Sequence, residues 1–172
     1  MKQPIARHVL YAGNHWCSNV ICLIKIHLMR FELKDSKNRL SVTLDQGKYN
    51  DTTIAWNRNY LSTTISIGAG CFVGEYIAET MTFDYFKFRK EVVNLYDDPD
   101  GLANFNCLSE HLKLSIKGDG QGQFKAACIA IYEPGSEPVE VKFNIYIDQR
   151  QISALISQLD AILEKYPVIH EA

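Results

Sequence analysis

The sequence predicts an α+β domain with an antiparallel, strongly curved sheet of about seven strands and two helices, one central at about 82–96 and one C-terminal at about 149–166. Two observations support this fold class. Apolar residues recur at every second position over most of the chain after residue 29, which is the pattern of half-buried strands. The pattern changes twice to a helical period, and no glycine-rich strand–helix unit of the doubly wound kind is present.

Four strands are predicted before the central helix. Apolar and polar residues alternate around Phe31, along 40–44 and along 61–67. Residues 71–78 follow a Gly-Ala-Gly turn and are predicted to form the return strand of a hairpin. The segment 46–59 is rich in Gly, Asn and Asp, so a long loop or an irregular sheet edge is expected there.

The central helix is predicted from apolar residues that share one helical face: Tyr85, Phe88, Val92, Leu95 and Tyr96. Thr82 is the predicted N-cap, and Asp84 lies in the first turn, where a carboxylate interacts favourably with the helix dipole. Residues 97–101, Asp-Asp-Pro-Asp-Gly, are expected to end the helix because proline cannot continue it.

Three or four further strands are predicted between the two helices, arranged as a meander. Residues 112–116 and 139–147 alternate between apolar and polar side chains, whereas residues 124–132 are apolar on both faces, as in a central strand. Gly118–Gly122 is predicted to be a hairpin turn and not a phosphate loop, because it lacks the Lys-Ser/Thr pair and leads into a strand.

The C-terminal helix has the clearest signal. Asp148 and Gln151 form a predicted capping box, and Pro167 ends the helix. The apolar stripe is expected to lie on the sheet and to be a main source of stability. Its members are Ile152, Leu155, Ile156, Leu159, Ile162, Leu163 and Tyr166.

The charge is distributed unevenly along the chain. The formal net charge is −2, but residues 1–28 carry three basic and no acidic side chains, whereas residues 29–172 carry 15 basic and 20 acidic ones. The folded part is therefore expected to prefer a basic partner, and nucleic-acid binding is not expected. Membrane insertion is not expected either, because the most apolar run, residues 20–28, is short and contains Lys25.

Residues 1–28 do not match the rest of the chain and are predicted to be an extraneous or disordered N-terminal segment. A single domain is expected at 29–168, with a frayed tail at 169–172. The histidines and cysteines between His15 and His27 do not have the spacing of a zinc finger, so no metal is predicted.

The five cysteines lack the paired spacing of a disulfide framework, which favours a reducing, cytoplasmic compartment. Cys71 and Cys128 lie in apolar runs and are expected to be buried. Cys107 and His111 are close in sequence, but His111 alternates with the outward-facing Lys113. We therefore expect an exposed histidine there and no catalytic pair, and no cofactor is predicted.

The acidic turn, defined here as Asp97, Asp98 and Asp100, is the candidate partner-binding site. It lacks the alternating ligand positions and the final Glu of a calcium loop. The first expectation is a solvated turn, and the second is a patch that contacts a basic partner.

Several stretches between Arg30 and Tyr166 follow a recognisable order. They are Asn-Arg-Asn-Tyr-Leu at 57–61, Gly-Cys-Phe-Val-Gly-Glu-Tyr at 70–76, Thr-Phe-Asp at 82–84, Leu-Lys-Leu-Ser-Ile at 112–116, Gly-Asp-Gly at 118–120, and Asp-Gln at 148–149 before a helix that ends in Tyr-Pro. This order resembles the WapI-type immunity protein family, small bacterial proteins that protect a cell from the wall-associated contact-dependent toxins of its kin. Tyr60 replaces the usual tryptophan of the family, and Arg150 the usual threonine.

The resemblance implies a non-catalytic protein that neutralises a cognate bacterial toxin by direct binding. The alternative is a small-ligand-binding or enzymatic domain that uses the concave face of the sheet. A deep pocket with convergent carboxylates would favour this alternative, and a filled core would count against it. A structural or homodimeric module is the third hypothesis.

Overall fold

The computed structural model describes residues 29–47 and 54–169. The predictions made for residues 1–28, 48–53 and 170–172 lie outside the described residues.

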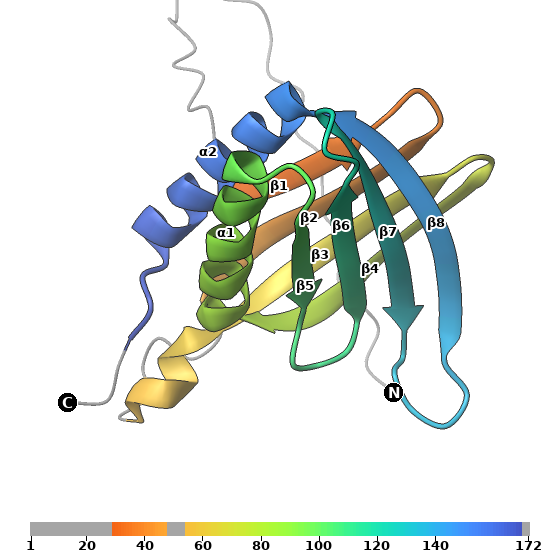
Figure 1. Ribbon diagram of the computed structural model, residues 1–172. Coiled ribbons are helices and arrows are strands. Elements are labelled where there is room, and N and C mark those ends of the chain that lie inside the picture. Colours follow the sequence, from red (N-terminus) through yellow and green to blue (C-terminus); the bar gives the residue numbers. More distant parts are fainter. Residues whose placement is uncertain (1–28, 48–53, 170–172) are drawn as a thin grey trace, which may run out of the picture.

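Two antiparallel four-stranded sheets, each followed by a helix, form the fold (Figure 1). In the first sheet, β1 (Met29–Lys34), β2 (Asn38–Gly47), β3 (Tyr60–Ala69) and β4 (Phe72–Met81) pair in chain order and lead into α1 (Thr82–Asp97). In the second, β5 (Leu102–Asn106), β6 (Leu112–Gly118), β7 (Gln123–Tyr132) and β8 (Val139–Asp148) pair likewise and lead into α2 (Gln149–Lys165). A short 3-10 helix, η1 (Ala55–Asn59), precedes β3. The predicted antiparallel α+β class with two helices is confirmed.

The strand count of about seven becomes eight because of β5. This strand has five residues, of which Ala103 and Phe105 are buried. Two buried positions are too few to make a two-residue period recognisable in the sequence, since strand signals need a longer run. The predicted meander after the central helix is confirmed, and β7 is a central strand with β6 and β8 as its neighbours.

The helices lie side by side, with α1 packed along β5 and α2 along β1 (Figure 1). The strands of the two sheets run in clearly different directions in this view, so the sheets cross. Each helix thus covers the first strand of one sheet. The last strand of the first sheet, β4, lies on the side away from α2.

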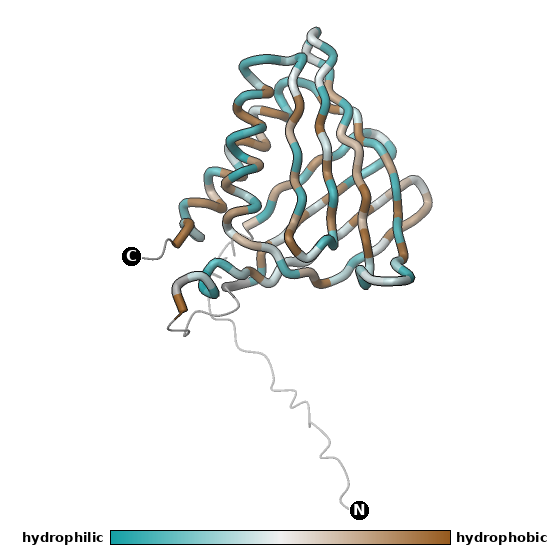
Figure 2. The backbone as a smooth tube through the Cα atoms, turned by 60° about the horizontal axis from the view of Figure 1, so that its bottom comes forward, coloured by the Kyte–Doolittle hydropathy of each residue, from teal (hydrophilic) through white to brown (hydrophobic). Residues whose placement is uncertain are grey.

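The core fills the space between the two crossed sheets and the helices. Its centre is an aromatic cluster, and each of the four rings lies 5.3–6.3 Å from at least two of the others. The members are Phe31, Tyr85, Phe88 and Phe105, all fully buried. Along the strands hydrophobic and hydrophilic residues alternate (Figure 2), so each sheet turns one face to this core.

Both helices begin at hydrogen-bonded caps. At α2 the predicted capping box is confirmed: Gln151 N–H donates to Asp148 Oδ1 at 3.0 Å, and Asp148 N–H donates to Gln151 Oε1 at 3.2 Å. At α1 the predicted N-cap Thr82 is wrong by one residue. Met81 holds the cap position, its N–H donates to Asp84 Oδ2 at 2.8 Å, and the Thr82 hydroxyl donates to the carbonyl of Asn59 at 3.3 Å.

Cys128 is buried, as predicted, and burial raises its pKa to about 12. Cys71 is exposed, which contradicts the prediction. It lies in the tight turn between β3 and β4, next to Gly70 with a positive φ of 62°, so its side chain never reaches the core. The apolar residues on the two sides of Cys71 belong to two different strands, which this turn joins.

Candidate partner-binding surfaces

The acidic turn lies at the C-terminal end of α1, and all three of its aspartates are exposed. The hairpin between β6 and β7 holds its backbone in place, since Gly120 N–H donates to the carbonyl of Pro99 at 3.0 Å and Gly118 N–H to that of Gly101 at 3.3 Å. Only glycine fits at 118, because a Cβ there would lie 1.9 Å from the carbonyl oxygen of Pro99. The turn therefore presents its carboxylates to solvent from a fixed backbone.

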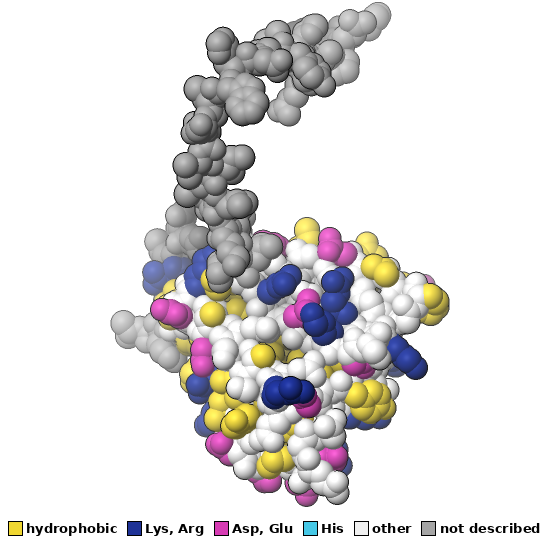
Figure 3. All heavy atoms as spheres, turned by 90° about the horizontal axis from the view of Figure 1, so that it is seen from above, with side chains coloured by type: hydrophobic (Ala, Val, Ile, Leu, Met, Phe, Trp, Pro, Cys, Tyr) yellow, Lys and Arg dark blue, Asp and Glu magenta, His cyan; other side chains and the backbone are white. Residues whose placement is uncertain are grey.

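Figure 3 views the molecule from the end where α1 terminates. Acidic and basic side chains are interspersed over this end, and hydrophobic side chains are scattered. In the described part of the chain, no three His, Cys, Asp or Glu side chains are placed so that they could hold a metal ion. The three exposed aspartates on a fixed backbone make the acidic turn a candidate for contact with a basic surface.

Cys107 and His111 are brought close by the loop between β5 and β6, but no hydrogen bond joins the Cys107 thiol to the His111 ring. The Cys107 thiol is buried, and this desolvation raises its pKa although the Leu112 N–H donates to the sulfur at 3.3 Å. His111 is half-buried and not exposed as predicted, and its Nδ1 lies 3.3 Å from the carbonyl of Ile131. A buried thiol with a raised pKa is a poor nucleophile.

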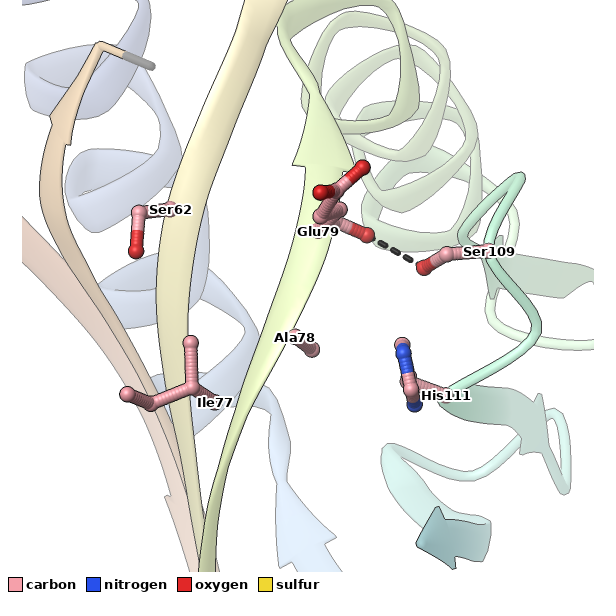
Figure 4. Close-up of a pocket in the computed structure, with 6 residues that line it drawn as sticks. All are labelled: Ser62, Ile77, Ala78, Glu79, Ser109 and His111. Atoms are coloured by element: carbon pink, nitrogen blue, oxygen red, sulfur yellow. Dashed lines mark hydrogen bonds between the residues drawn. The ribbon is translucent and has the colours of Figure 1, made fainter. Parts of the chain in front are cut away.

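A hollow of about 390 Å³ separates β4 from this loop (Figure 4). Glu79, Ser109 and His111 line it, which are residue types found in hydrolase triads. However, the Ser109 hydroxyl donates to the main-chain carbonyl of Glu79, and the side chain of Glu79 points away from His111 in Figure 4. The contact between Ser109 and the Glu79 carbonyl holds the loop against β4.

The concave-face alternative requires a deep pocket between the sheets, and the aromatic cluster fills that space. A second hollow, of about 310 Å³, lies where the inner faces diverge, and it is lined by Tyr76 of β4 and by β7 and β8. Its lining is mostly apolar, and Glu75 is the one acidic residue among the residues that line it. Convergent carboxylates, which the enzymatic alternative needs, are not found at this hollow.

Tyr76 joins the two sheets beside this second hollow. Its hydroxyl donates to the carbonyl of His111 at 2.7 Å and accepts from the N–H of Ile131 at 3.2 Å. Partial burial raises the pKa of Tyr76 to about 12, so the hydroxyl keeps its proton at neutral pH. The ring also lies 6.1 Å from the ring of Tyr132.

The outermost strand β4 exposes large apolar side chains that the sequence analysis did not single out. Phe72 is 68% exposed, Val73 83% and Ile77 73%. Tyr132 and Val139, which pair across β7 and β8, are exposed by 50% and 62%. Single exposed apolar residues are ordinary, but a group of this kind beside a strand edge is typical of an interaction surface.

The geometry defines the class first: an α+β domain of two four-stranded antiparallel sheets and two helices. Residues 30–167 match the model of the Immunity protein WapI-like family, and the chain belongs to this family. The comparison with curated proteins finds no match. None of the helices in residues 29–47 and 54–169 is long and apolar enough to cross a membrane.

Among solved structures, the chain is similar to one titled "Structure of the plant transcriptional regulator PBF-2", with a TM-score of 0.44 and 11% sequence identity over 80% of each chain. At this level of similarity nothing about function is transferred.

Proposed function

We propose that this protein is a cytoplasmic immunity protein that neutralises a cognate bacterial toxin by direct binding, without chemistry of its own. Membership of the WapI-like immunity family carries the proposal. Two different surfaces that are accessible for contact, the acidic turn and the exposed side of β4, support it.

The partner is proposed to be basic. The domain has an excess of acidic side chains, and the acidic turn concentrates three of them on a rigid backbone. Opposite charge accelerates the encounter of two proteins, which benefits a protein that must capture a toxin before it acts.

The decisive test examines the genes next to the one that encodes this protein, and a candidate toxin found there is purified and titrated with the protein. Purified protein is added to the toxin, and toxin activity is measured against the molar ratio. Neutralisation by binding ends at a fixed stoichiometry, and unmodified, active toxin is recovered after the complex is separated in denaturant. Neutralisation by far less than one equivalent, or recovery of a covalently altered toxin, would show an enzymatic mechanism. A toxin that neither binds nor loses activity would refute the proposal.

A further inference from the structure

We propose that the outer edge of β4 is a strand-addition site, which takes an extended segment of the partner whose side chains alternate between basic and apolar. This inference rests on the proposed function, because it names the surface by which the toxin is held. It follows from the direction of the backbone groups of β4, from the side chains around them and from their charge.

The backbone argument starts from two hydrogen bonds. In an antiparallel pair, the N–H and C=O of one residue point together toward the neighbouring strand, and those of the next residue point away from it. The carbonyl of Glu79 accepts from the Ser109 hydroxyl, and the N–H of Met81 donates to Asp84. Both groups thus point away from β3. The register between β3 and β4 has no bulge, so the same direction holds at Val73, Glu75 and Ile77.

The remaining edge is open within the described part of the chain. The loop between β5 and β6 and the cap of α1 occupy the edge at residues 79–81. No hydrogen bond from the described residues reaches the outward N–H and C=O groups of Val73, Glu75 and Ile77. An unpaired edge of this length is a template for another strand, and natural proteins usually block such an edge.

The side chains around the edge give a contact surface for each face of an added strand. On the outer face, Val73 and Ile77 flank Glu75. On the inner face, the hollow of about 310 Å³ lies between Tyr76 and an apolar shelf, defined here as Tyr132, Val139 and Val141. The loop after β7 extends beyond β4 in Figure 1, so the second sheet continues past the edge of the first. A strand added to β4 would cover this shelf.

Charge selects the occupant. Glu75 lies between Val73 and Ile77 on the outer face of the open edge, and the shelf on the inner face is apolar. Successive side chains of a strand point to opposite faces, so a partner strand that alternates basic and apolar residues would direct its basic side chains toward Glu75 and its apolar side chains toward the shelf. Opposite charges directly across a pair are favourable. Pairing of β4 with a second copy centred on Glu75 would place two glutamates opposite each other, which is unfavourable. In strand addition, main-chain hydrogen bonds supply affinity and the side-chain pockets supply specificity.

The test follows hydrogen exchange at the amides of Val73, Glu75 and Ile77 in the full chain. The probes are the toxin and two short synthetic peptides, one alternating lysine with valine and one alternating glutamate with valine. We expect rapid exchange in the free protein, protection by the toxin and by the lysine–valine peptide, and no protection by the glutamate–valine peptide. Protection of these amides in the free protein, by its own N-terminal segment or in a dimer detected by light scattering, would overturn the proposal.

Two variants sharpen the test. Glu75→Lys should weaken binding of the lysine–valine peptide about three- to tenfold and improve binding of the glutamate–valine peptide. Ile77→Pro removes an outward N–H without removing a bond to β3, and should abolish protection of the neighbouring amides. Glu164→Lys, an exposed site on α2, is the matched control. If Ile77→Pro unfolds, Glu75→Lys still decides, because its side chain is exposed.

The outcomes separate this inference from the proposed function. Toxin that is neutralised by wild-type protein and by both variants alike, without protection at β4, leaves the immunity function intact and refutes strand addition. Peptide protection without toxin binding refutes the immunity function and leaves the edge as a general strand acceptor. Protection by neither toxin nor peptide refutes strand addition outright.

Discussion

At the scale of single residues, Tyr76 is a side chain that couples the two sheets. It bridges His111 and Ile131 through one hydroxyl, and its pKa is raised from 10.0 to about 12 because burial disfavours the phenolate. A group that binds its proton more tightly in the folded state contributes its stability below the unfolded pKa and loses it as the pH rises. We therefore expect the free energy of unfolding to fall as the pH rises from 10.0 to about 12.

The Tyr76→Phe variant tests this expectation. It should lose about 1 kcal/mol at neutral pH, the typical contribution of a hydrogen bond, and its stability should fall less steeply above pH 10. Urea unfolding at several pH values measures both effects. The stability of the variant should still fall somewhat at high pH, because burial also raises the pKa of Tyr85, whose hydroxyl lies 2.9 Å from that of Thr80. An identical slope for both proteins would contradict the role given to Tyr76.

At the scale of elements, the N-terminus of α2 depends on the charged form of Asp148. Hydrogen bonds from the Arg150 side chain and then from the Gln151 N–H lower the pKa of this carboxyl below its usual value of 3.8. A carboxyl whose pKa is lowered in the folded protein contributes stability at pH values above its usual pKa. This contribution is lost as the pH falls through the lowered pKa. The cap should therefore weaken only in strong acid.

Substitutions at Asp148 check this cap. Asp148→Ala should lower the melting temperature at neutral pH, because it leaves N–H groups at the start of α2 without a partner. Asp148→Asn keeps an acceptor and should melt closer to the wild type. The difference between the wild type and Asp148→Asn should shrink as the pH is lowered in thermal unfolding followed by circular dichroism. A difference that grows in acid would contradict the direction of the pKa shift.

The caps also show how far local signals extend. The box at Asp148 and Gln151 was predicted correctly because both partners belong to one short segment. The cap of α1 was misplaced by one residue because Thr82 bonds instead to Asn59, a residue distant in sequence. Asp84 still serves the cap from within the segment. Where a side chain has two available hydrogen-bond partners, tertiary packing decides which one it bonds to. A local sequence pattern holds no information about that packing.

At the scale of the whole molecule, the acidic turn should govern the rate of toxin capture. The triple variant Asp97→Asn, Asp98→Asn and Asp100→Asn should slow association about three- to tenfold at low ionic strength, with little change in dissociation. The effect should diminish as salt is added, because salt screens exposed charges. Folding should be intact, since acidic side chains at a helix C-terminus are unfavourable for the helix.

Stopped-flow or surface-based kinetics at two salt concentrations measure this effect, with Glu164→Gln as the matched control for the loss of an exposed acidic side chain. Unchanged association of the triple variant at low salt would remove the acidic turn from the proposed interface. Variants of the β4 edge should instead change the rate of dissociation, because main-chain hydrogen bonds form only after the two proteins have met.

Strand and helix types follow from the period of apolar residues, which is a property of each segment alone, so the α+β class, both helices and the family resemblance were all accessible from the sequence. The acidic turn was likewise visible as Asp97, Asp98 and Asp100, and its three exposed carboxylates are placed where α1 ends. The division into two crossed sheets and the position of β4 as an outermost strand came only from the tertiary structure. The backbone groups of Val73, Glu75 and Ile77 are open or paired according to which strand lies beside them. That neighbour is chosen by packing across the whole chain, and the alternation of side chains along β4 is the same in either case.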